Sequence, residues 1–398
     1  MKILWIKSDF LHPTTRGGQI RTLETLRCLH QRHEIHYVAV EDPGQPEGPA
    51  RSREYCSRAY PVRHRVPGHG SPAFYAQAAA GLFSSMPVAI SRFRSGEMRR
   101  QVDQLMDEGE FDRVVCDFLT PAPNISRIER CLLFQHNVET VIWQRRARSA
   151  PDPARRAYFR LQAARMCAYE KRICRQAGHV IAVSESDART MRDLFGVSRL
   201  SVAPTGVDVE WFAPAATAAP VADLVFLGSM DWLPNVDGIG HFVREALPLI
   251  RRRRPECSLA IVGRTPAAEV LALAQAVPGI QVTGTVPDVR PYLWGSRVAI
   301  VPLRIGSGTR LKIYEAMAAR VPVVSTTVGA EGLEVRHPEN IRLADTPEAF
   351  AGECLDLLEH PPERERLAQA GCGLVKARFS WEEVSKTFDR ILEAGPCG

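Results

Sequence analysis

Short apolar runs alternate with amphipathic segments along the whole chain. The runs are rich in β-branched residues, as expected for strands that a parallel sheet buries on both faces, and the segments between them repeat apolar positions at helical spacing. In the first half the pattern predicts strands in KILWIK, HYVAV, DRVVC, RCLLF, HVIAV and RLSVAP, and helices near 19–31, 94–107, 137–148, 152–177 and 185–195. In the second half it predicts strands in LVFLG, SLAIVG, IQVTG, VAIVP and VPVVS, and helices near 235–252, 266–276, 287–294 and 308–319.

Strand–helix alternation in both halves predicts an α/β protein with two doubly wound, mainly parallel sheets. A chain of 398 residues is long enough for two such domains. The turn PTGVD is followed by an Ala/Pro-rich stretch at 213–222, which indicates the region of the linker. We therefore expect an N-terminal domain over 1–204 and a C-terminal domain over 205–378.

The segment 379–398 forms a separate element. Its residues FSWEEVSKTFDRILEAG, at 379–395, have the pattern of an amphipathic helix. Ser380 and Glu383 have the spacing of a capping box, which predicts that the helix begins there.

The composition narrows the class of protein. With 45% hydrophobic and 24% charged residues the chain is an ordinary globular protein, and its apolar runs are too short to span a bilayer. The opening MKILWIKSDF has no signal-peptide pattern and is expected to form the first strand. The ten cysteines form no C-x-x-C pair and no cluster with histidine, which argues against zinc and against a disulfide framework. We therefore expect a cytoplasmic protein.

The net charge of +6 is unevenly distributed. Residues 1–200 hold 31 Lys and Arg against 21 Asp and Glu, whereas the remainder holds 20 against 24, and the densest basic segment spans 145–176. This segment could face an anionic membrane, in particular the inner face of the plasma membrane, or nucleic acid. It could also be a solvated face in a chain where 45 of the 51 cations are arginine. Nucleic acid is the least favoured of the three interpretations.

The stretch RIGSGTRLKIYEAMAARVPVVST, at 304–326, is the strongest candidate for ligand binding. In a doubly wound domain ligands bind beyond the carboxyl ends of the strands, and this stretch follows a predicted strand. Gly306 and Gly308 let backbone amides approach a ligand, and the following helix presents its N-terminus to an anion. Arg310 and Lys312 in the first helical turn oppose the helix dipole, a conflict that a bound diphosphate would remove. The alternative is an ordinary loop with a surface Lys–Glu pair.

Two other side chains allow a functional and a structural interpretation. Glu315 shares a helical face with Lys312 among apolar neighbours, so its carboxylate is either solvated or accepts hydrogen bonds from a vicinal diol such as a ribose. His136 follows the strand RCLLF and is therefore expected at the carboxyl edge of the first sheet. It is a structural residue or, beside Asn137 and Glu139, a functional one.

Several common motifs are absent from the sequence. It contains no G-x-G-x-x-G, no P-loop, no G-x-S-x-G and no H-E-x-x-H. It also contains no D-x-D pair, the usual acidic clamp for a metal bound to a diphosphate. We therefore expect no cofactor and no required metal.

Together the motifs resemble those of glycosyltransferase family 4. In the first half the similar stretches are the glycine loop at 17–18, HNVE at 136–139, VIAVSESD at 180–187 and PTGVD at 204–208. In the second half they are FLGSMDWLPN, IVGRTP, VTGTVPDVRPYL and GSGTRLKIYEAMAARVPVVSTTVGAEGL. The resemblance covers nearly the whole chain and includes the sugar transferases of bacterial exopolysaccharide systems.

The resemblance implies the GT-B architecture, with two facing Rossmann-like domains and a C-terminal helix that crosses back to the first. It implies that the C-terminal domain binds a nucleoside-diphosphate sugar and that the N-terminal domain binds a glycan or lipid-linked acceptor. The donor-binding residues would be Gly228, Gly263, Arg264, Gly306, Ser307, Gly308, Thr309 and Glu315. The acceptor-side residues would be Gly17, Gly18, Arg21, Asn137 and Glu139. The catalytic residues would be His136, Arg310 and Lys312.

The chain departs from the family's pattern in the donor region. Ser307 occupies the position where members often carry the first of two glutamates, and Thr205 occupies that of a common asparagine. After the first strand of the C-terminal domain many relatives have an Arg and a Lys, whereas the stretch 229–231 here is Ser-Met-Asp. We therefore interpret Arg310 and Lys312 as a displaced clamp for the diphosphate.

The sequence thus predicts a retaining glycosyltransferase of bacterial polysaccharide biosynthesis. No side chain is a convincing nucleophile, so we expect a front-face path in which the leaving diphosphate is stabilised electrostatically. His136 would position the donor sugar or the acceptor. Two alternatives stay open. A nucleotide-sugar epimerase of the same architecture would consume donor without an acceptor, and a catalytically silent glycan- or lipid-binding protein would explain Ser307.

Overall fold

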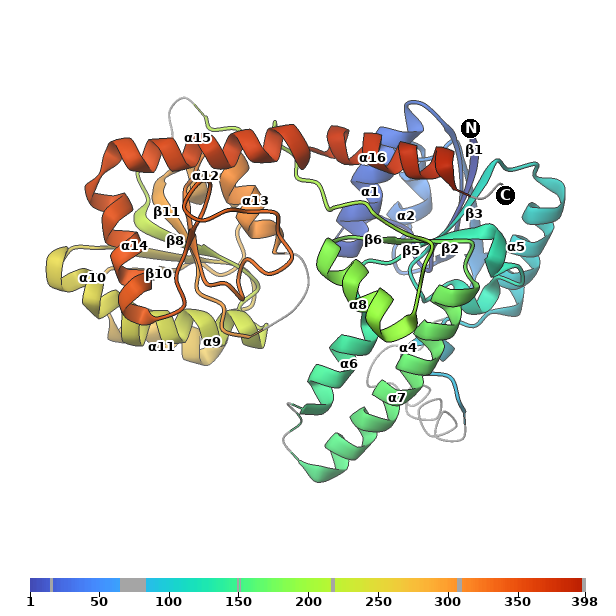
Figure 1. Cartoon of the computed structure of the whole chain (residues 1–398), viewed down its shortest axis with the longest axis horizontal. Helices are drawn as coiled ribbons and strands as arrows, with labels where there is room; N and C mark the ends of the chain where they lie inside the picture. Colours follow the sequence, from blue (N-terminus) through green and yellow to red (C-terminus); the bar gives the residue numbers. More distant parts are fainter. Residues whose placement is uncertain are drawn as a thin grey trace. The chain divides into compact units, whose positions relative to one another are not determined.

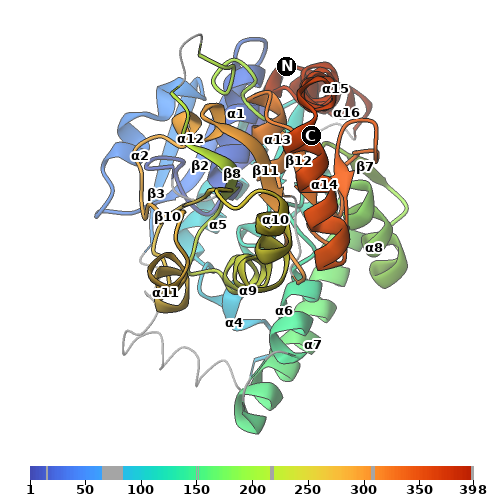
Figure 2. The same cartoon turned by 90° about the vertical axis from the view of Figure 1, so that its left-hand side faces the viewer.

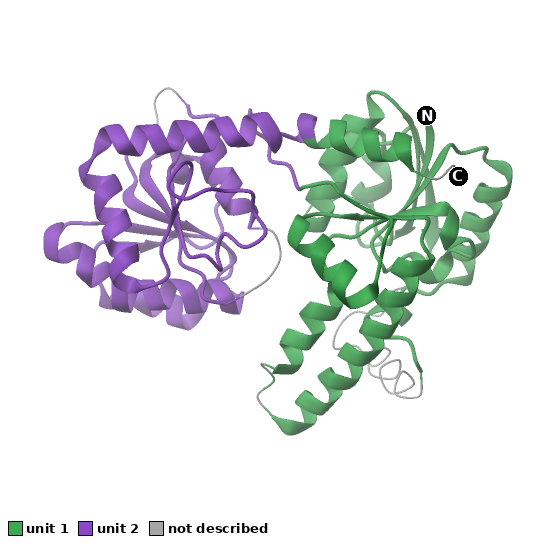
Figure 3. Cartoon of the chain, in the orientation of Figure 1, with its two compact units in different colours: residues 1–204, 384–398 green, residues 205–383 purple. Residues whose placement is uncertain are grey.

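The computed structural model describes residues 1–14, 17–64, 84–148, 150, 152–215, 219–305 and 310–395. The chain divides into two compact units, coloured separately in Figure 3. Residues 1–204 with 384–398 form unit 1, and residues 205–383 form unit 2. Each unit has a parallel sheet and its own hydrophobic core, which confirms the predicted fold class.

Unit 1 contains a seven-stranded sheet in the order β3-β2-β1-β4-β5-β6-β7, with every neighbouring pair parallel. The strands are β1 (Lys2–Ile6), β2 (Glu34–Glu41), β3 (Arg58–Arg63), β4 (Arg113–Asp117), β5 (Cys131–Phe134), β6 (His179–Ala182) and β7 (Leu200–Val202). The helices are α1 (Gly17–His30), α2 (Glu47–Ala50), α4 (Val88–Ser91), α5 (Gly96–Glu108), α6 (Glu139–Arg148), α7 (Pro153–Gln176) and α8 (Glu185–Phe195), with α16 (Trp381–Ala394) added from the end of the chain. The edge strand β3 was not predicted, because Pro61 and exposed arginines interrupt its apolar pattern.

Successive residues of β1 face opposite sides of this sheet, as the period of a strand requires. Leu4 and Ile6 belong to a core shared with residues of α5, α7 and α8. Ile3 and Trp5 belong to a second core shared with residues of α1 and α16. Helices therefore cover both faces of the sheet (Figure 1), which explains why its central strands are apolar throughout.

The helix α16 packs against the sheet of unit 1. The Ser380 hydroxyl accepts the amide hydrogen of Glu383 at 3.3 Å, which is one half of the predicted capping box. Further along, the Phe388 ring packs against Trp5 and Phe134, with ring centroids 5.6 and 5.1 Å apart. The predicted return of the C-terminal helix to the first domain is confirmed.

The chain passes from unit 2 to unit 1 inside α16, after Glu383. The first residues of this segment stay with unit 2, because Phe379 stacks on Tyr314 with centroids 4.4 Å apart and Ser380 pairs with Val207. The structure therefore divides the chain a few residues later than the predicted boundary at 378/379.

Unit 2 contains a six-stranded parallel sheet in the order β10-β9-β8-β11-β12-β13. The strands are β8 (Ala222–Leu227), β9 (Leu259–Val262), β10 (Ile280–Val282), β11 (Ser296–Val301), β12 (Val323–Ser325) and β13 (Arg342–Leu343). The helices are α9 (Leu233–His241), α10 (Leu247–Arg253), α11 (Ala268–Ala276), α12 (Arg290–Trp294), α13 (Leu311–Ala318), α14 (Pro347–Glu359) and α15 (Pro361–Arg378). In Figures 1 and 2, α9, α10 and α11 lie together on one side of the strands, and α13 and α15 lie on the other.

The helix predicted over 235–252 is confirmed: helical residues run without a break from Leu233 to Arg253. A π-helical turn at Phe242–Ala246 separates α9 from α10, because Pro248 has no amide hydrogen with which to continue the α-helical ladder. Two other features of unit 2 differ from the expectations. The helix predicted over 308–319 begins at Leu311, so Arg310 is its N-cap residue and does not lie in the first turn. The helices α14 and α15 and the two-residue strand β13 were not predicted.

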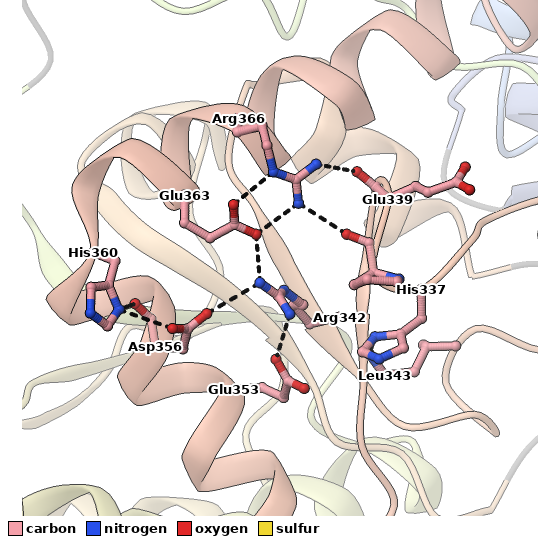
Figure 4. A network of polar contacts seen from close by, with 10 residues as sticks. His337, Glu339, Arg342, Leu343, Glu353, Asp356, His360, Glu363 and Arg366 are labelled. Carbon is pink, nitrogen blue, oxygen red and sulfur yellow. Dashed lines mark hydrogen bonds and ion pairs between the residues drawn. The ribbon is translucent and has the colours of Figure 1, made fainter.

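A network of ion pairs joins β13, α14 and α15 (Figure 4). Arg342, whose side chain is only 15% exposed, lies 3.3 Å from Glu353, 3.2 Å from Asp356 and 2.5 Å from Glu363. Arg366 also pairs with Glu363, at 2.7 Å. Hydrogen bonds from Arg366 and the charge of Arg342 lower the pKa of Glu363 to about 2. Three carboxylates therefore surround the partly buried Arg342, and Arg366 shares one of them.

We expect Arg342→Ala to lower the free energy of unfolding by about 2–3 kcal/mol, because three neighbouring carboxylates lose the cation between them. Urea unfolding at pH 7 measures this loss. Arg336→Ala is the control, since it removes an exposed arginine 3.9 Å from Glu339 and should cost less than about 0.5 kcal/mol. Equal losses in the two variants would contradict a coupled network.

The same network predicts a dependence on pH. The folded-state pKa of Glu363, about 2, lies below its ordinary value of 4.5. Its contribution to stability is therefore present above about pH 4.5 and is lost as the pH falls toward 2. This acid-induced loss should be smaller in Arg342→Ala than in the unsubstituted protein, and an unchanged loss would contradict the assignment.

Candidate functional site

The carboxyl ends of β8 and β9 meet closely in unit 2. The Gly228 amide donates to the Val262 carbonyl at 3.0 Å, and the Met230 amide donates to the Arg264 carbonyl at 2.9 Å, so the two loops continue the contact between their strands. A Cβ atom on Gly263 would lie 1.6 Å from the Gly228 carbonyl oxygen, which excludes any side chain there. The predicted donor residues Gly228, Gly263 and Arg264 therefore share one edge of the sheet.

Lys312 reaches this edge from the first turn of α13. Its Nζ donates to Asn235 Oδ1 at 2.9 Å. The same Nζ lies 2.9 Å from the place that a Cβ on Gly228 would occupy. Burial lowers the pKa of Lys312 to about 7; Glu315 opposes this shift and Arg310 adds to it. Lys312 is thus a half-buried cation at the end of a strand, which does not fit the alternative of a surface Lys–Glu pair.

Two arginines lie near the same loops. Arg310 is buried, and its guanidinium carbon lies 5.9 Å from the centroid of the Trp232 ring. Arg264 is exposed, and its Nε donates to the Ser229 hydroxyl at 3.0 Å. Together with Lys312 they bring cations from two segments, the start of α13 and the loop after β9, to the loop that follows β8. The other predicted donor residues, Gly306, Ser307, Gly308 and Thr309, lie outside the described residues.

Glu315 follows Lys312 one turn later on α13 and is half-buried. Burial raises the pKa of its carboxyl group, and Lys312 opposes the shift. Within the stretches that the structure describes, this carboxylate accepts no hydrogen bond. A partly desolvated carboxylate gains from hydroxyl donors, so the position is compatible with a bound diol.

In unit 1, the carboxyl end of β4 places the buried Asp117 among four donors. Its carboxylate accepts hydrogen bonds from Lys7 Nζ at 2.8 Å, Trp5 Nε1 at 2.8 Å and the Thr22 hydroxyl at 2.7 Å. His136 Nε2 lies 2.8 Å from the Asp117 Oδ1 atom. Burial disfavours the carboxylate, but Lys7 and His136 outweigh it, and the pKa of Asp117 lies below its ordinary value. Asp117 is therefore ionised and fully engaged.

His136 is buried against Phe134, with ring centroids 4.7 Å apart. Burial lowers the pKa of His136 to about 4 although Asp117 opposes the shift, so the imidazole is neutral at pH 7. Since Nε2 faces an acceptor, it carries the hydrogen, and Nδ1 is left as an acceptor. Nδ1 lies 3.2 Å from the position of a Cβ on Gly18, beside the first turn of α1.

The other predicted acceptor-side residues are only partly brought together. Arg21 is buried and its Nη1 donates to the His136 carbonyl at 3.4 Å; burial lowers its pKa to about 10. Gly17 begins α1, and a Cβ on it would meet no described atom within 4 Å. Among the described contacts, none joins the side chain of Asn137 or Glu139 to His136. The HNVE stretch is therefore not a single cluster.

Three residues that organise these edges were not predicted. Lys7 and Asp117 directly follow apolar strand residues, so a charge at the end of a buried strand was the available signal. Asn235 lies in DWLPN, and its partner Lys312 is 77 positions away. No local pattern links these two, and the sequence could not have paired them.

Two general features bear on the chemistry. Within the described part of the chain, no group of three or more His, Cys, Asp and Glu side chains could hold a metal ion. None of the described helices combines the length and the apolar character needed to cross a membrane.

Comparison with known proteins gives the family. Residues 15–211 match the family described as Glycosyltransferase Family 4, and residues 222–360 match the family described as Glycosyl transferases group 1. The chain is a glycosyltransferase of family 4. An uncharacterized 44.6 kDa protein in the cps region of Klebsiella pneumoniae is 19% identical to this glycosyltransferase, over 96% of this chain and 97% of its own.

Solved structures share the fold of this glycosyltransferase. Sucrose-phosphate synthase from Thermosynechococcus elongatus has a TM-score of 0.70 at 17% identity, over 99% of this chain and 98% of its own. HepE from Anabaena, solved in complex with UDP and glucose, has a TM-score of 0.67 at 13% identity, over 99% of this chain and 100% of its own. The likeness confirms the GT-B fold.

We expect Asp117→Asn to destabilise the glycosyltransferase by about 3–5 kcal/mol, because the buried Lys7 ammonium loses its carboxylate. Urea unfolding followed by tryptophan fluorescence measures the loss, since Trp5 belongs to the same network. Asp112→Asn is the control, because this exposed carboxylate accepts the Lys2 amide, at 2.7 Å, and should cost about 1 kcal/mol. Similar losses would show that the buried network contributes no more than a surface contact.

Proposed function

We propose that the protein is a retaining glycosyltransferase that moves a sugar from a nucleoside-diphosphate donor to a glycan or lipid-linked acceptor in bacterial polysaccharide biosynthesis. The observation that carries the donor assignment is the Lys312 ammonium beside Gly228, at the carboxyl edge of a doubly wound sheet. Ligands bind at this edge in such sheets. A cation there can form charge-assisted hydrogen bonds with a diphosphate.

The cations have a direct role in the proposed reaction. When the bond between the sugar and the diphosphate breaks, negative charge develops on the leaving phosphate. Lys312 and Arg310 would stabilise this charge, and Glu315 would hold the ribose hydroxyls. The site would then need no metal, and sugar transfer should continue in EDTA.

The buried network of unit 1 limits the possible nucleophiles. Asp117 is surrounded by donors and fully buried, so its carboxylate is not free to attack a sugar carbon. His136 is neutral and offers Nδ1 as an acceptor, which suits a hydrogen bond from a sugar hydroxyl. These properties support a front-face path without a covalent intermediate.

The comparisons support the pathway and the donor class by similarity. The relative in Klebsiella pneumoniae belongs to a cps region, and HepE from Anabaena was solved with UDP and glucose. On these grounds we propose a nucleoside-diphosphate sugar as donor and a polysaccharide precursor as acceptor. Release of nucleoside diphosphate would separate a transferase from a silent binding protein, and dependence of that release on acceptor would separate it from an epimerase.

Donor binding can be tested without knowing the sugar. Lys312→Ala should weaken binding of UDP, GDP or ADP by roughly 1.5–3 kcal/mol, the scale of a hydrogen bond to a charged group, and Arg310→Ala should act in the same direction. Isothermal titration calorimetry measures the affinities. Lys376→Ala, which removes an exposed lysine of α15, is the control and should change nothing. Unchanged affinity in both site variants would overturn the clamp.

The basic hairpin of unit 1 supports a second part of the proposal. Helices α6 and α7 extend from the unit as a pair (Figure 1), and Arg155, Arg156 and Arg160 are exposed on α7. Leu161 beside them is 41% exposed. Arg155 pairs with Asp152 at 3.2 Å, so part of the charge is compensated. An exposed cationic helix with an apolar residue suits an anionic membrane surface, where a lipid-linked acceptor would be found.

We expect the protein to float with anionic liposomes and not with neutral ones, because each nearby arginine contributes about 1 kcal/mol of attraction to anionic lipid. Binding should fall between 50 and 300 mM salt through screening. It should also fall in Arg155/Arg156/Arg160→Ala, whereas Arg252/Arg253/Arg336→Ala, with the same charge removed from exposed positions of unit 2, should still bind. Equal flotation with both lipids, or none, would contradict the membrane proposal.

A further inference from the structure

The environment of Lys312 raises the question of what holds a single lysine at the edge of unit 2. The chain contains only six lysines among its 51 basic residues. A lysine side chain has four rotatable carbon–carbon bonds, so fixing its ammonium group at one point requires a partner. Nζ donates a hydrogen bond to Asn235 Oδ1 at 2.9 Å and also lies 4.5 Å from the centroid of the Phe226 ring.

The Asn235 side chain is itself fixed. It is only 2% exposed, and its Nδ2 donates to the Ser229 carbonyl at 2.8 Å. A carbonyl oxygen can only accept, so the nitrogen of the amide must face Ser229 and the oxygen must face Lys312. The backbone amide of Asn235 also donates to the Trp232 carbonyl, at 2.9 Å. The acceptor for the ammonium group is thus preorganised by the loop that follows β8.

The absence of a side chain at Gly228 leaves room for the Lys312 ammonium group. A Cβ on Gly228 would lie 2.5 Å from Asn235 Nδ2 and 2.9 Å from Lys312 Nζ. The place that a side chain on Gly228 would need is therefore taken by the Asn235 amide and the Lys312 ammonium group. Because Asn235 is neutral, the hydrogen bond orients the ammonium group without cancelling its charge.

We propose that Asn235 is a positioning residue, which holds the Lys312 ammonium group over Gly228 in the charged form that a donor diphosphate requires. This rests on the proposed function, since the ligand is the diphosphate of the sugar donor. The loop at 229–231, Ser-Met-Asp, contains no cation of its own. In this proposal the cation is Lys312 from α13, and the loop fixes the Asn235 amide that orients the ammonium group.

The ionisation of Lys312 gives the proposal a distinctive readout. Burial lowers the pKa of Lys312 to about 7, so small changes at Asn235 alter the charged fraction near neutral pH. On its own helix, Glu315 opposes the shift and Arg310 adds to it. In the loops after β8 and β9, the charged groups Asp231 and Arg264 are both linked to the Ser229 hydroxyl. On α9, Asp237 is paired with Arg304 at 2.6 Å.

The test follows the titration of Lys312 in the full chain without ligand. Lysine labelled with ¹³C at the ε carbon gives few signals, and Lys312→Arg assigns the relevant one. Asn235→Ala removes the acceptor and should lower the pKa of Lys312, whereas Asn235→Asp keeps the shape, adds a charge and should raise it. Asp237→Asn, a charge change on the same helix at a group paired with Arg304, is the control and should leave the titration almost unchanged.

Affinity for UDP, GDP and ADP at pH 6.5 and 8.5 completes the test. Asn235→Ala should weaken binding by about fivefold to tenfold, the scale of one hydrogen bond, with the greater loss at pH 8.5. Asn235→Asp should reduce the difference between the two pH values. If neither variant moves the Lys312 titration, or if Asn235→Ala weakens binding equally at both pH values, the positioning role is wrong. If no nucleotide binds the unsubstituted protein, the proposed donor site fails, while the NMR titration still reports on Asn235.

Discussion

Two loops can meet at the edge of unit 2 only because neither Gly228 nor Gly263 carries a side chain. The Gly228 carbonyl oxygen lies where a Cβ of Gly263 would be, at 1.6 Å, and a Cβ on Gly228 would collide with Asn235. Everything else at this edge depends on that closeness. It brings the start of α9 near the end of β9, it lets the Asn235 amide bond to the Ser229 carbonyl, and it leaves room for Lys312 to reach over the strand end.

The two units fix a lysine at a strand end in different ways. In unit 1, Lys7 contacts the carboxylate of Asp117, so the pair carries no net charge and its other donors complete a closed network. In unit 2, Lys312 contacts the neutral amide of Asn235, so its charge remains available to a ligand. Burying an isolated charge costs free energy. The Lys7–Asp117 pair avoids this cost and stabilises the fold, whereas Lys312 beside a neutral amide does not avoid it, and its pKa is lowered. A carboxylate partner neutralises the lysine and stabilises the fold, whereas a neutral amide partner leaves the charge of the lysine available to an anionic ligand.

The sequence predicted most of the strands of both sheets, because buried parallel strands have a strong local signal. It could not predict β3, whose apolar pattern is broken by Pro61. It also could not predict the π-helical turn before Pro248, because a proline inside a helical pattern can either end the helix or be accommodated within it, and tertiary packing determines which occurs. In the candidate site, Lys312 was predicted to contact the diphosphate because lysine is rare in this chain and follows a glycine-rich loop, and this role stays a prediction. Its partner Asn235 was missed, because nothing local distinguishes an asparagine that fixes a distant ammonium group from one that caps a turn.

The packing of α16 has a consequence for how the protein is made. Trp5 and Phe134 in the first sheet contact Phe388, so one face of unit 1 is completed by residues that follow the whole of unit 2 in the chain. During synthesis, residues 205–383 must leave the ribosome before this apolar face can be covered. The nascent first domain therefore leaves this part of its aromatic surface uncovered for as long as the second domain takes to be translated.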